Sequence, residues 1–360
     1  MPEPAASAAP RQTLSAWDGT AFLIGIVIGV GIFKAPQLVA MFAGSTWAFI
    51  GVWLLGGLIT LIGALCYAEL GSTYPNAGGE YHFLTRAYGK AVGILFAWAR
   101  GTVIQTGAIA AVAFVYGEYA STLMPLGAHS VAIHAALAVT VFTGINLLGT
   151  LQGKVAQHIF TVLDVAAIFL LIVAGLLVSS QGGFSAPAPA AATGDTVSWG
   201  GIGLAMVFVL LTYGGWNEAA YLSAEMRDVK RNMARTLIIS IGFVVVVYTL
   251  VNLAYLGALG LDGLAKSPVP AAAVMRQAFG DAGALILSLF ICGAALSTLN
   301  ATIFTGGRVY FALGRDLAGL GGLGVWSARG ENPANAFLLQ AAIALSLVLL
   351  GSFHPNGFKT

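Results

Sequence analysis

The feature that most constrains this chain is a series of long apolar segments that contain almost no charged residues. A segment of about 20 apolar residues is long enough to cross the hydrocarbon core of a bilayer, which is about 30 Å thick. Charged residues make up only 8% of the 360 residues, whereas a soluble domain carries about 25%. So few charges cannot solvate the surface of a globule of this size, and we therefore expect a polytopic membrane protein.

Nine apolar runs predict nine transmembrane helices, with boundaries good to about ±2–4 residues. The runs are continuous and do not alternate with a period of two, which excludes a β-barrel. We expect residues 1–16 to form a disordered tail without the features of a signal peptide, and residues 181–198, rich in Gly, Ala and Pro, to form an external loop. The runs cover residues 17–40, 47–71, 90–123, 129–150, 155–179, 200–222, 234–259, 282–313 and 334–352.

The positive charges predict the orientation of the chain. When the loops are assigned alternately to the two sides, one side holds only Lys266 and Arg276, with Lys359 near the end of the chain. Loops rich in Lys and Arg stay in the cytoplasm, so the N-terminus is expected there. The protein itself is expected in the cell membrane. The basic residues on the N-terminal side are Arg11, Arg86, Lys90, Lys154, Arg227, Lys230, Arg231, Arg235, Arg308, Arg315 and Arg329.

Two of the predicted helices contain glycine-rich interruptions. The first helix has Gly25, Gly29 and Gly31 within seven residues, and the sixth has Gly214 and Gly215. Each glycine weakens a helix by about 1 kcal/mol relative to alanine. Paired interruptions in corresponding helices indicate a transporter site near the middle of the membrane. The alternative is close packing of helices through small residues, but the pairing favours broken helices.

Four segments together resemble one family. They are GIVIGVGIFKAP at 25–36, ALCYAELGSTYPNAGGEYHFL at 64–84, YGGWNEAAYLSAEMRDVKRNMAR at 213–235 and STLNATIFTGGRVYFALGRD at 297–316. The chain resembles the amino acid–polyamine–organocation (APC) transporter superfamily, closest to its L-type amino acid transporter and bacterial amino acid permease branch. The resemblance implies an all-α membrane protein with a LeuT-like fold of two inverted five-helix repeats. Residues 17–180 would form the first repeat and 199–360 an incomplete second one, so the chain is expected to be truncated after about nine helices.

Breaking the first helix frees backbone groups that must face a cavity or a ligand, because lipid cannot satisfy them. The N–H groups of Gly29, Val30 and Gly31 open the second half-helix, and its positive dipole end makes them a site for a carboxylate. The carbonyls of Val27 and Ile28 can accept hydrogen bonds from an ammonium group. An α-amino acid carries both charges on one carbon, so the backbone alone can bind the part that all amino acids share.

The sixth helix is expected to complete this substrate site. The carbonyls of Leu211 and Gly214 can accept from the ammonium group, Gly215 lies at the break, and Asn217 either binds substrate or caps the second half-helix, the cap being favoured. The resemblance assigns these positions the same role, with two departures. Val30 stands where the family often has a small hydroxyl residue, which removes one donor, and Leu211 stands where the L-type branch often has an aromatic gate.

Asp164 is the most deeply placed ionisable residue and the candidate for ion coupling. Many members of the family have a lysine at its position in the fifth helix, so the lysine's role does not transfer to an acid. Three roles stay open: Asp164 could bind a proton, bind sodium beside the helix 1 carbonyls, or pair with a neighbouring Arg, Ser or Thr.

Other ionisable residues have less specific expectations. Lys34 and Glu118 should be hydrated near the outer ends of their helices, Arg100 should pair or extend to the interface, and Glu218 could reach the cavity or a water path. Acidic residues at the N-terminal rim could form gating pairs with Arg, although solvated loops are the favoured reading. These rim residues are Glu69, Glu80, Glu225 and Asp228.

The leading functional prediction is secondary active transport of amino acids by alternating access, as a proton symporter or an antiporter. The alternatives are a polyamine, organocation or other amine permease of the same fold, or an inactive truncated permease. An enzyme is disfavoured because the five scattered histidines show no metal-ligand spacing and no nucleophile–base motif appears. No P-loop or channel filter is visible either. We expect no cofactor, no metal and no catalytic residue, although transport could be coupled to H⁺ or Na⁺. We also expect no nucleic-acid partner. The sequence does not identify a partner subunit.

Overall fold

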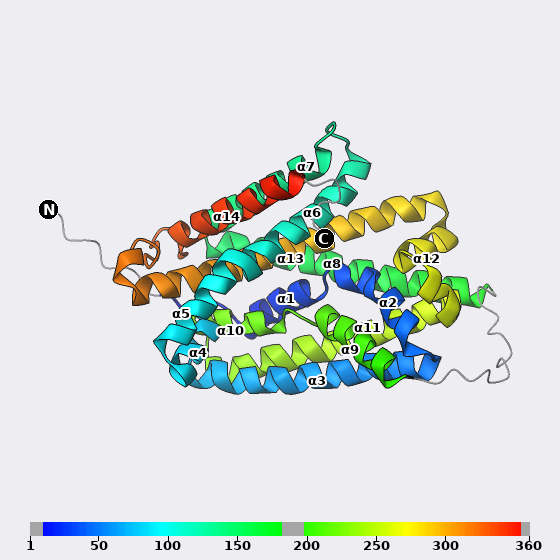
Figure 1. Ribbon diagram of the computed structural model, residues 1–360, viewed down its shortest axis with the longest axis horizontal. Helices are drawn as coiled ribbons and strands as arrows, with labels where there is room; N and C mark the ends of the chain where they lie inside the picture. The colour runs from blue at the N-terminus through cyan, green and yellow to red at the C-terminus, as the bar shows by residue number, and fades with distance from the viewer. Residues whose placement is uncertain (1–9, 182–197, 354–360) are drawn as a thin grey trace.

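The computed structural model describes residues 10–181 and 198–353, and every regular element in these ranges is helical. Residues 1–9 of the predicted tail and residues 182–197 of the predicted external loop lie outside the described residues. The helices run roughly along one long axis, and the chain enters at one end of the resulting bundle (Figure 1).

The first half of the bundle contains two short helices followed by four long spans. Its elements are α1 (Ala16–Val27), η1 (Val30–Phe33), α2 (Ala35–Ala43), α3 (Thr46–Thr73), α4 (Glu80–Tyr88), α5 (Lys90–Ala99), η2 (Arg100–Ile104), α6 (Gln105–Leu123), α7 (Ser130–Leu148) and α8 (Thr150–Ser180). The segment η2 is a π-helical turn that joins α5 and α6 into one continuous span.

The second half begins with another interrupted helix. Its elements are α9 (Trp199–Thr212), η3 (Trp216–Glu218), α10 (Ala219–Leu222), η4 (Ser223–Glu225), α11 (Val229–Lys266), α12 (Pro270–Phe279), α13 (Asp281–Asp316), η5 (Ala318–Leu320) and α14 (Ala334–Ser352). The non-helical backbone of Gly260 marks a kink near the end of α11.

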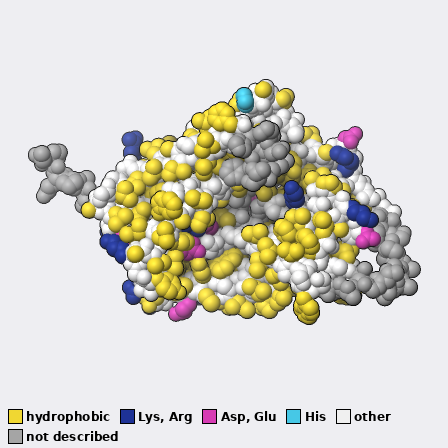
Figure 2. All heavy atoms as spheres, viewed as in Figure 1, with side chains coloured by type: hydrophobic (Ala, Val, Ile, Leu, Met, Phe, Trp, Pro, Cys, Tyr) yellow, Lys and Arg dark blue, Asp and Glu magenta, His cyan; other side chains and the backbone are white. Residues whose placement is uncertain are grey.

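The described residues contain eight helices that are long and apolar enough to cross a membrane. The predicted first span corresponds to α1, η1 and α2 together, and it falls outside that number because it is broken into short pieces. Eight of the nine predicted apolar runs therefore coincide with these helices, and the first run coincides with the broken helix. Figure 2 shows hydrophobic side chains over the middle of the visible face, with Lys and Arg side chains toward its two ends, as expected for a bundle surrounded by lipid.

Both interruptions predicted from the glycines are breaks in the structure, and both lie near the middle of the bundle (Figure 1). In the first span, α1 ends at Val27, and an extended Gly29 precedes η1. In the sixth span, α9 ends at Thr212, and Gly215 has a φ of 104° before η3 begins. This left-handed conformation favours glycine, because a Cβ would clash with the backbone. A Cβ on Gly215 would also press into the side chain of Ile26 on α1.

The packing holds the broken helices inside the bundle. The half-helix α1 contacts α8, α11 and α13, while α2 packs between α9 and α11. Trp53 of α3, Tyr213 beside the sixth-span break and Tyr248 of α11 form an edge-to-face and tilted aromatic cluster, with ring centroids 5.2–6.0 Å apart. The breaks are therefore surrounded by long continuous helices, which support irregular backbone away from lipid.

The last residues of the predicted tail differ from the expectation of disorder. Leu14 is fully buried, its N–H donates to the carbonyl of Glu225 at 2.9 Å, and its carbonyl accepts from the N–H of Arg227 at 2.8 Å. Ser15 then caps α1 in a capping box with Asp18. These contacts fix the segment 10–15 against the end of the sixth span. We call this end of the bundle, formed by residues 10–15, α4, α10, η4 and residues 317–333, the N-terminal face.

Candidate functional site

A cavity of about 160 Å³ lies where the two broken spans meet. Six of the nine predicted substrate-site residues line it: Val27, Gly29, Val30, Gly31, Leu211 and Gly214. Four further residues, which sequence reasoning did not identify, complete the lining: Ile26, Val112, Thr212 and Thr298. We call this cavity the central pocket. Its lining carries no ionisable side chain, so the charged groups of a ligand would face backbone dipoles and two threonine hydroxyls.

The break in the first span supplies the backbone donors. The N–H of Gly29 already donates to the carbonyl of Val27 at 2.8 Å. Val30 and Gly31 begin η1, and the first N–H groups of a helix have no acceptor within it. Both residues line the central pocket, so the positive end of the turn lies at its wall. Of the three predicted carboxylate donors, Val30 and Gly31 are the two whose N–H groups remain available.

A tyrosine on α11 binds the carbonyls on the other side of the break. The hydroxyl of Tyr248 donates to the carbonyl of Val27 at 2.6 Å and lies 3.4 Å from the carbonyl of Thr212. This phenol therefore bridges the ends of α1 and α9. The carbonyl of Val27 can still offer its second lone pair, whereas the fully buried Ile28 is not among the residues that line the pocket. Tyr248 was missed in the sequence because nothing in its own helix marks it.

The sixth span contributes to the pocket up to its break but not beyond it. Leu211 is 70% exposed and Gly214 lines the cavity, whereas Gly215 packs against Ile26. Asn217 points elsewhere: its amide donates to the carboxylate of Glu80 at 3.1 Å. The amide makes no cap hydrogen bond to η3 and does not line the central pocket, because Glu80 on α4 provides a charged acceptor that sequence spacing could not reveal.

Asp164 occupies a different environment from every other acidic side chain of the spans. It is 1% exposed in the middle of α8, and neither carboxyl oxygen has a hydrogen-bond partner of good geometry among the described residues. The hydroxyl of Ser297 on α13 faces it. An Arg partner, one of the pairings considered from the sequence, is not present among the described ion pairs.

A ladder of buried polar side chains leads from Asp164 toward the N-terminal face. The amide of Gln157 donates to Thr161 at 3.2 Å and to Ser297 at 3.1 Å. Asn300 donates to the carbonyl oxygen of the Gln157 side chain at 2.9 Å and accepts from Asn146 at 3.0 Å. Gly25 of α1 packs directly on this ladder, since a Cβ there would collide with it. The first glycine of the motif thus serves close packing, which was the alternative reading of the motif.

The N-terminal rim contains buried ion pairs instead of the solvated loops that were favoured from the sequence. Arg308 of α13 is fully buried and its Nε lies 2.6 Å from the carboxylate of Glu225, which is also buried. Arg100 is buried and contacts both Glu80 and Glu218. Glu225 and Glu80 therefore correct the solvated-loop reading, because the tertiary fold covers both carboxylates with neighbouring helices. Glu69, Asp228, Lys34 and Glu118 are exposed.

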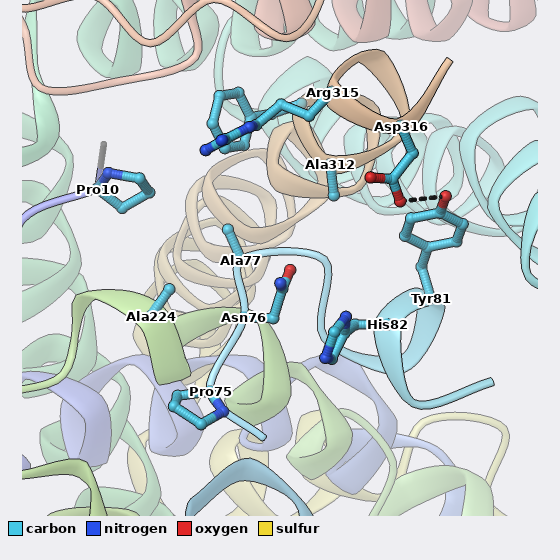
Figure 3. Close-up of a pocket in the computed structure, with 11 residues that line it drawn as sticks. Pro10, Pro75, Asn76, Ala77, Tyr81, His82, Ala224, Ala312, Arg315 and Asp316 are labelled. Atoms are coloured by element: carbon cyan, nitrogen blue, oxygen red, sulfur yellow. Dashed lines mark hydrogen bonds between the residues drawn. The ribbon is translucent and has the colours of Figure 1, made fainter. Parts of the chain in front are cut away.

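A second cavity, of about 360 Å³, lies on the N-terminal face (Figure 3). The hydroxyl of Tyr81 donates to Asp316 at 2.7 Å across it, and burial together with this carboxylate raises the pKa of Tyr81 to about 12. Burial and the nearby Arg86 lower the pKa of His82. Tyr81 therefore remains a hydrogen-bond donor and His82 neutral at physiological pH. This cavity does not touch either helix break, which separates it from the central pocket.

In the described residues, no group of three or more His, Cys, Asp or Glu side chains is arranged to hold a metal ion. Both cysteines are free: Cys66 is exposed and Cys292 is buried.

Comparison with known proteins identifies the family. A family model described as "Amino acid permease" matches residues 14–356. The chain belongs to this family. The permease is 30% identical to the human (Homo sapiens) b(0,+)-type amino acid transporter 1 over 352 residues, which cover 96% of the chain and 71% of that protein. It is 32% identical to the rabbit (Oryctolagus cuniculus) large neutral amino acids transporter small subunit 2 over 302 residues, 82% of the chain and 56% of that protein.

Solved structures show that the permease has the LeuT fold. The crystal structure of MhsT in complex with L-phenylalanine superposes with a TM-score of 0.65 at 17% identity, covering 97% of the chain and 82% of that protein. A Na⁺-coupled sialic acid symporter in a substrate-bound outward-open state gives a TM-score of 0.61 at 15% identity, covering 97% and 80%. The chain is thus a multi-pass membrane protein for amino acid transport, and the expectation that it is a transporter and not an enzyme is confirmed.

Proposed function

We propose that this permease carries amino acids across the cell membrane by alternating access, with the substrate held in the central pocket. The observation that carries the proposal is the pairing of two helix breaks around one cavity whose lining is backbone and uncharged side chains. The N–H groups of Val30 and Gly31 would bind the substrate carboxylate, and the carbonyls of Val27, Leu211 and Gly214 its ammonium group.

We further propose that the substrate side chain is neutral. A cationic side chain in the central pocket would be buried without a counter-charge, and burial of an unpaired charge is costly. The lining contains no Asp or Glu that could receive it. This argues against the alternative of a polyamine or organocation substrate. A relative named as a transporter of large neutral amino acids is consistent with this choice.

Asp164 is our candidate for coupling transport to an ion gradient. An isolated carboxylate inside a membrane-spanning bundle is unfavourable, so it should bind a cation when no protein group balances it. A proton satisfies this need at one oxygen, and sodium could do so beside Ser297. The polar ladder from Asp164 to Asn146 supplies groups that would stabilise either cation on its way to the N-terminal face.

We infer that the N-terminal face lies in the cytoplasm. It carries most of the Lys and Arg side chains of the loops, as cytoplasmic loops do. The central pocket includes the exposed Leu211 on its far side, whereas Tyr221 and Leu222, below the sixth-span break, are fully buried. This combination corresponds to a state closed toward the N-terminal face.

Uptake into proteoliposomes tests the proposal. Substrate-dependent uptake of a radiolabelled neutral amino acid, competed by other neutral amino acids and not by lysine or putrescine, is the expected result. Equal competition by the cations would reject the neutral-substrate assignment. Absence of saturable amino acid binding by folded protein would reject the central pocket.

A further inference from the structure

The inner half of the broken sixth span begins in a cluster of buried charges that the transport proposal does not use. Arg100 lies at its centre, with Nη1 3.2 Å from Glu80 and Nη2 hydrogen-bonded to Glu218. Its guanidinium also stacks on Tyr221, with Cζ 4.5 Å from the ring centroid. The cluster therefore joins three parts of the fold: the α5–α6 span, α4, and the segment η3–α10 directly after the break.

Glu80 binds the same segment, η3–α10, from the other side. One carboxylate oxygen accepts from Tyr67 at 2.7 Å and from Asn217 at 3.1 Å, and the other accepts from Tyr221 at 2.7 Å. The preceding Gly79 has a φ of 49° and packs on the Tyr221 ring, where a Cβ would come within 2.6 Å. Gly79 thus lets the loop approach the segment closely.

The position of Arg100 depends on the π-helical turn η2, which begins at this residue. Such turns add one residue to a helix, redirect the side chains around it and occur frequently at functional sites. The hydroxyl of Tyr310 on α13 binds the carbonyl of Gly101 in the same turn. The turn therefore places Arg100 between Glu80 and Glu218 and is itself supported by α13.

The cluster is incompletely satisfied, unlike the neighbouring pair of Arg308 and Glu225. Oε2 of Glu218 and Nε of Arg100 are buried without a hydrogen-bond partner among the described residues. An unsatisfied buried polar atom is destabilising, because the hydrogen bonds it made to water are lost and not replaced. By contrast, Arg308 binds Glu225 through Nε and the carbonyl of Phe304 through Nη1. Opening toward water would let both unpaired atoms of the cluster form hydrogen bonds. The difference in free energy between its closed and open states is therefore moderate.

The geometry points to Arg100 as a positioning residue that latches the inner half of the sixth span when the N-terminal face is closed. The segment Trp216–Glu218 follows the pocket-lining Gly214 by two residues, so displacing it would open the central pocket toward the N-terminal face. The cavity of Figure 3 lies beside this latch, because Tyr81, which directly follows Glu80, and Ala224 of η4 are in its wall. Arg308 and Glu225 stay paired as a fixed anchor. This inference rests on the proposed alternating access.

Cysteine accessibility tests the latch without requiring transport. In a background with Cys66→Ser and Cys292→Ser, which removes both native cysteines, Ala220→Cys places a reporter on α10, where Ala220 is buried. A membrane-impermeant maleimide is applied to each side of the membrane in turn. Arg100→Met should raise the rate of labelling from the side of the N-terminal face about tenfold or more. Loss of the latch shifts the population toward the state that is open on this side. Glu218→Gln keeps the shape and should give a smaller rise in the same direction.

Arg11→Met is the matched control, because it removes an ion pair of the same face whose Arg side chain is 77% exposed; its labelling should equal that of the background. Labelling of folded Arg100→Met at the background rate would overturn the latch. If Arg100→Met does not fold, the Glu218→Gln variant provides the test. Labelling of this variant at the background rate would also overturn the proposal. Uptake by the same proteins reports separately on the transport proposal.

Discussion

The central pocket and the N-terminal face both place polar groups inside a membrane-spanning bundle, but they draw them from different sources. The pocket uses the backbone groups that the two breaks release, and its lining has no ionisable side chain. The N-terminal face uses side chains, with Arg100 and Arg308 buried against acidic partners. Backbone dipoles can hold a zwitterion and release it without leaving a buried charge behind. Paired side chains hold helices together until both partners can be hydrated.

Asp164 belongs to neither group. It is a buried side-chain charge like those of the N-terminal face, but it lacks a hydrogen-bond partner of good geometry among the described residues. The comparison therefore predicts that each of the three environments responds differently when one group is changed: the pocket loses binding, the paired charges lose stability and Asp164 loses ion coupling.

The largest expected effect is loss of binding in Gly31→Leu. The new side chain would fill the carboxylate site, and even its Cβ would lie only 3.3 Å from Cγ2 of Thr212. Equilibrium binding of a radiolabelled neutral amino acid should become undetectable while the purified protein remains folded. Gly51→Leu is the control, because a Cβ at Gly51 meets open space. Full binding by folded Gly31→Leu would show that the substrate carboxylate does not bind at Gly31, and it would contradict the assignment of the central pocket.

Arg308→Met should lower the free energy of unfolding by about 3–5 kcal/mol, because it leaves the carboxylate of Glu225 buried without a counter-charge. Thermal unfolding in detergent measures the change. Arg11→Met provides the exposed comparison, where breaking an ion pair costs about 0–1 kcal/mol. Equal stability of the two variants would show that burial does not distinguish the paired charges of the N-terminal face.

Asp164→Asn should preserve exchange of internal for external substrate but abolish accumulation driven by an ion gradient. The amide keeps the size of the side chain and removes the charge that attracts a cation. Uptake against pH and sodium gradients measures the loss, and Glu69→Gln, an exposed residue of α3, serves as the control. Wild-type accumulation with unchanged pH and sodium dependence would place Asp164 among purely structural groups.

The smallest expected effect is tighter binding in Val30→Ser. A hydroxyl at this pocket-lining position would add one donor to the substrate carboxylate, worth about 0.5–1.5 kcal/mol. Isothermal titration against the wild-type protein measures the gain, and Val30→Ala separates the hydroxyl from the change in size. Affinity no higher than that of Val30→Ala would mean that the side chain points away from the carboxylate.

The apolar runs and the glycines are enough to predict the spans and the two breaks. Apolar runs fix the helices because lipid tolerates nothing else over a full crossing, and Gly29 and Gly215 mark the breaks because glycine weakens a helix locally. The roles proposed for the backbone of Val30 and Gly31 follow from the break alone, so they could be predicted without knowing the neighbouring helices.

Which side chains meet depends on how the helices pack in three dimensions. Tyr248 binds Val27 from 221 positions away in the chain, and Asn217 turns to Glu80 across 137 positions. Glu225 looks like an exposed loop residue until α13 brings Arg308 against it. Charge pairing acts over a few ångströms in space and leaves no periodic trace in the chain, whereas hydrophobic burial acts on whole segments. Because of this difference in range, the spans could be predicted from the sequence and the latch could not.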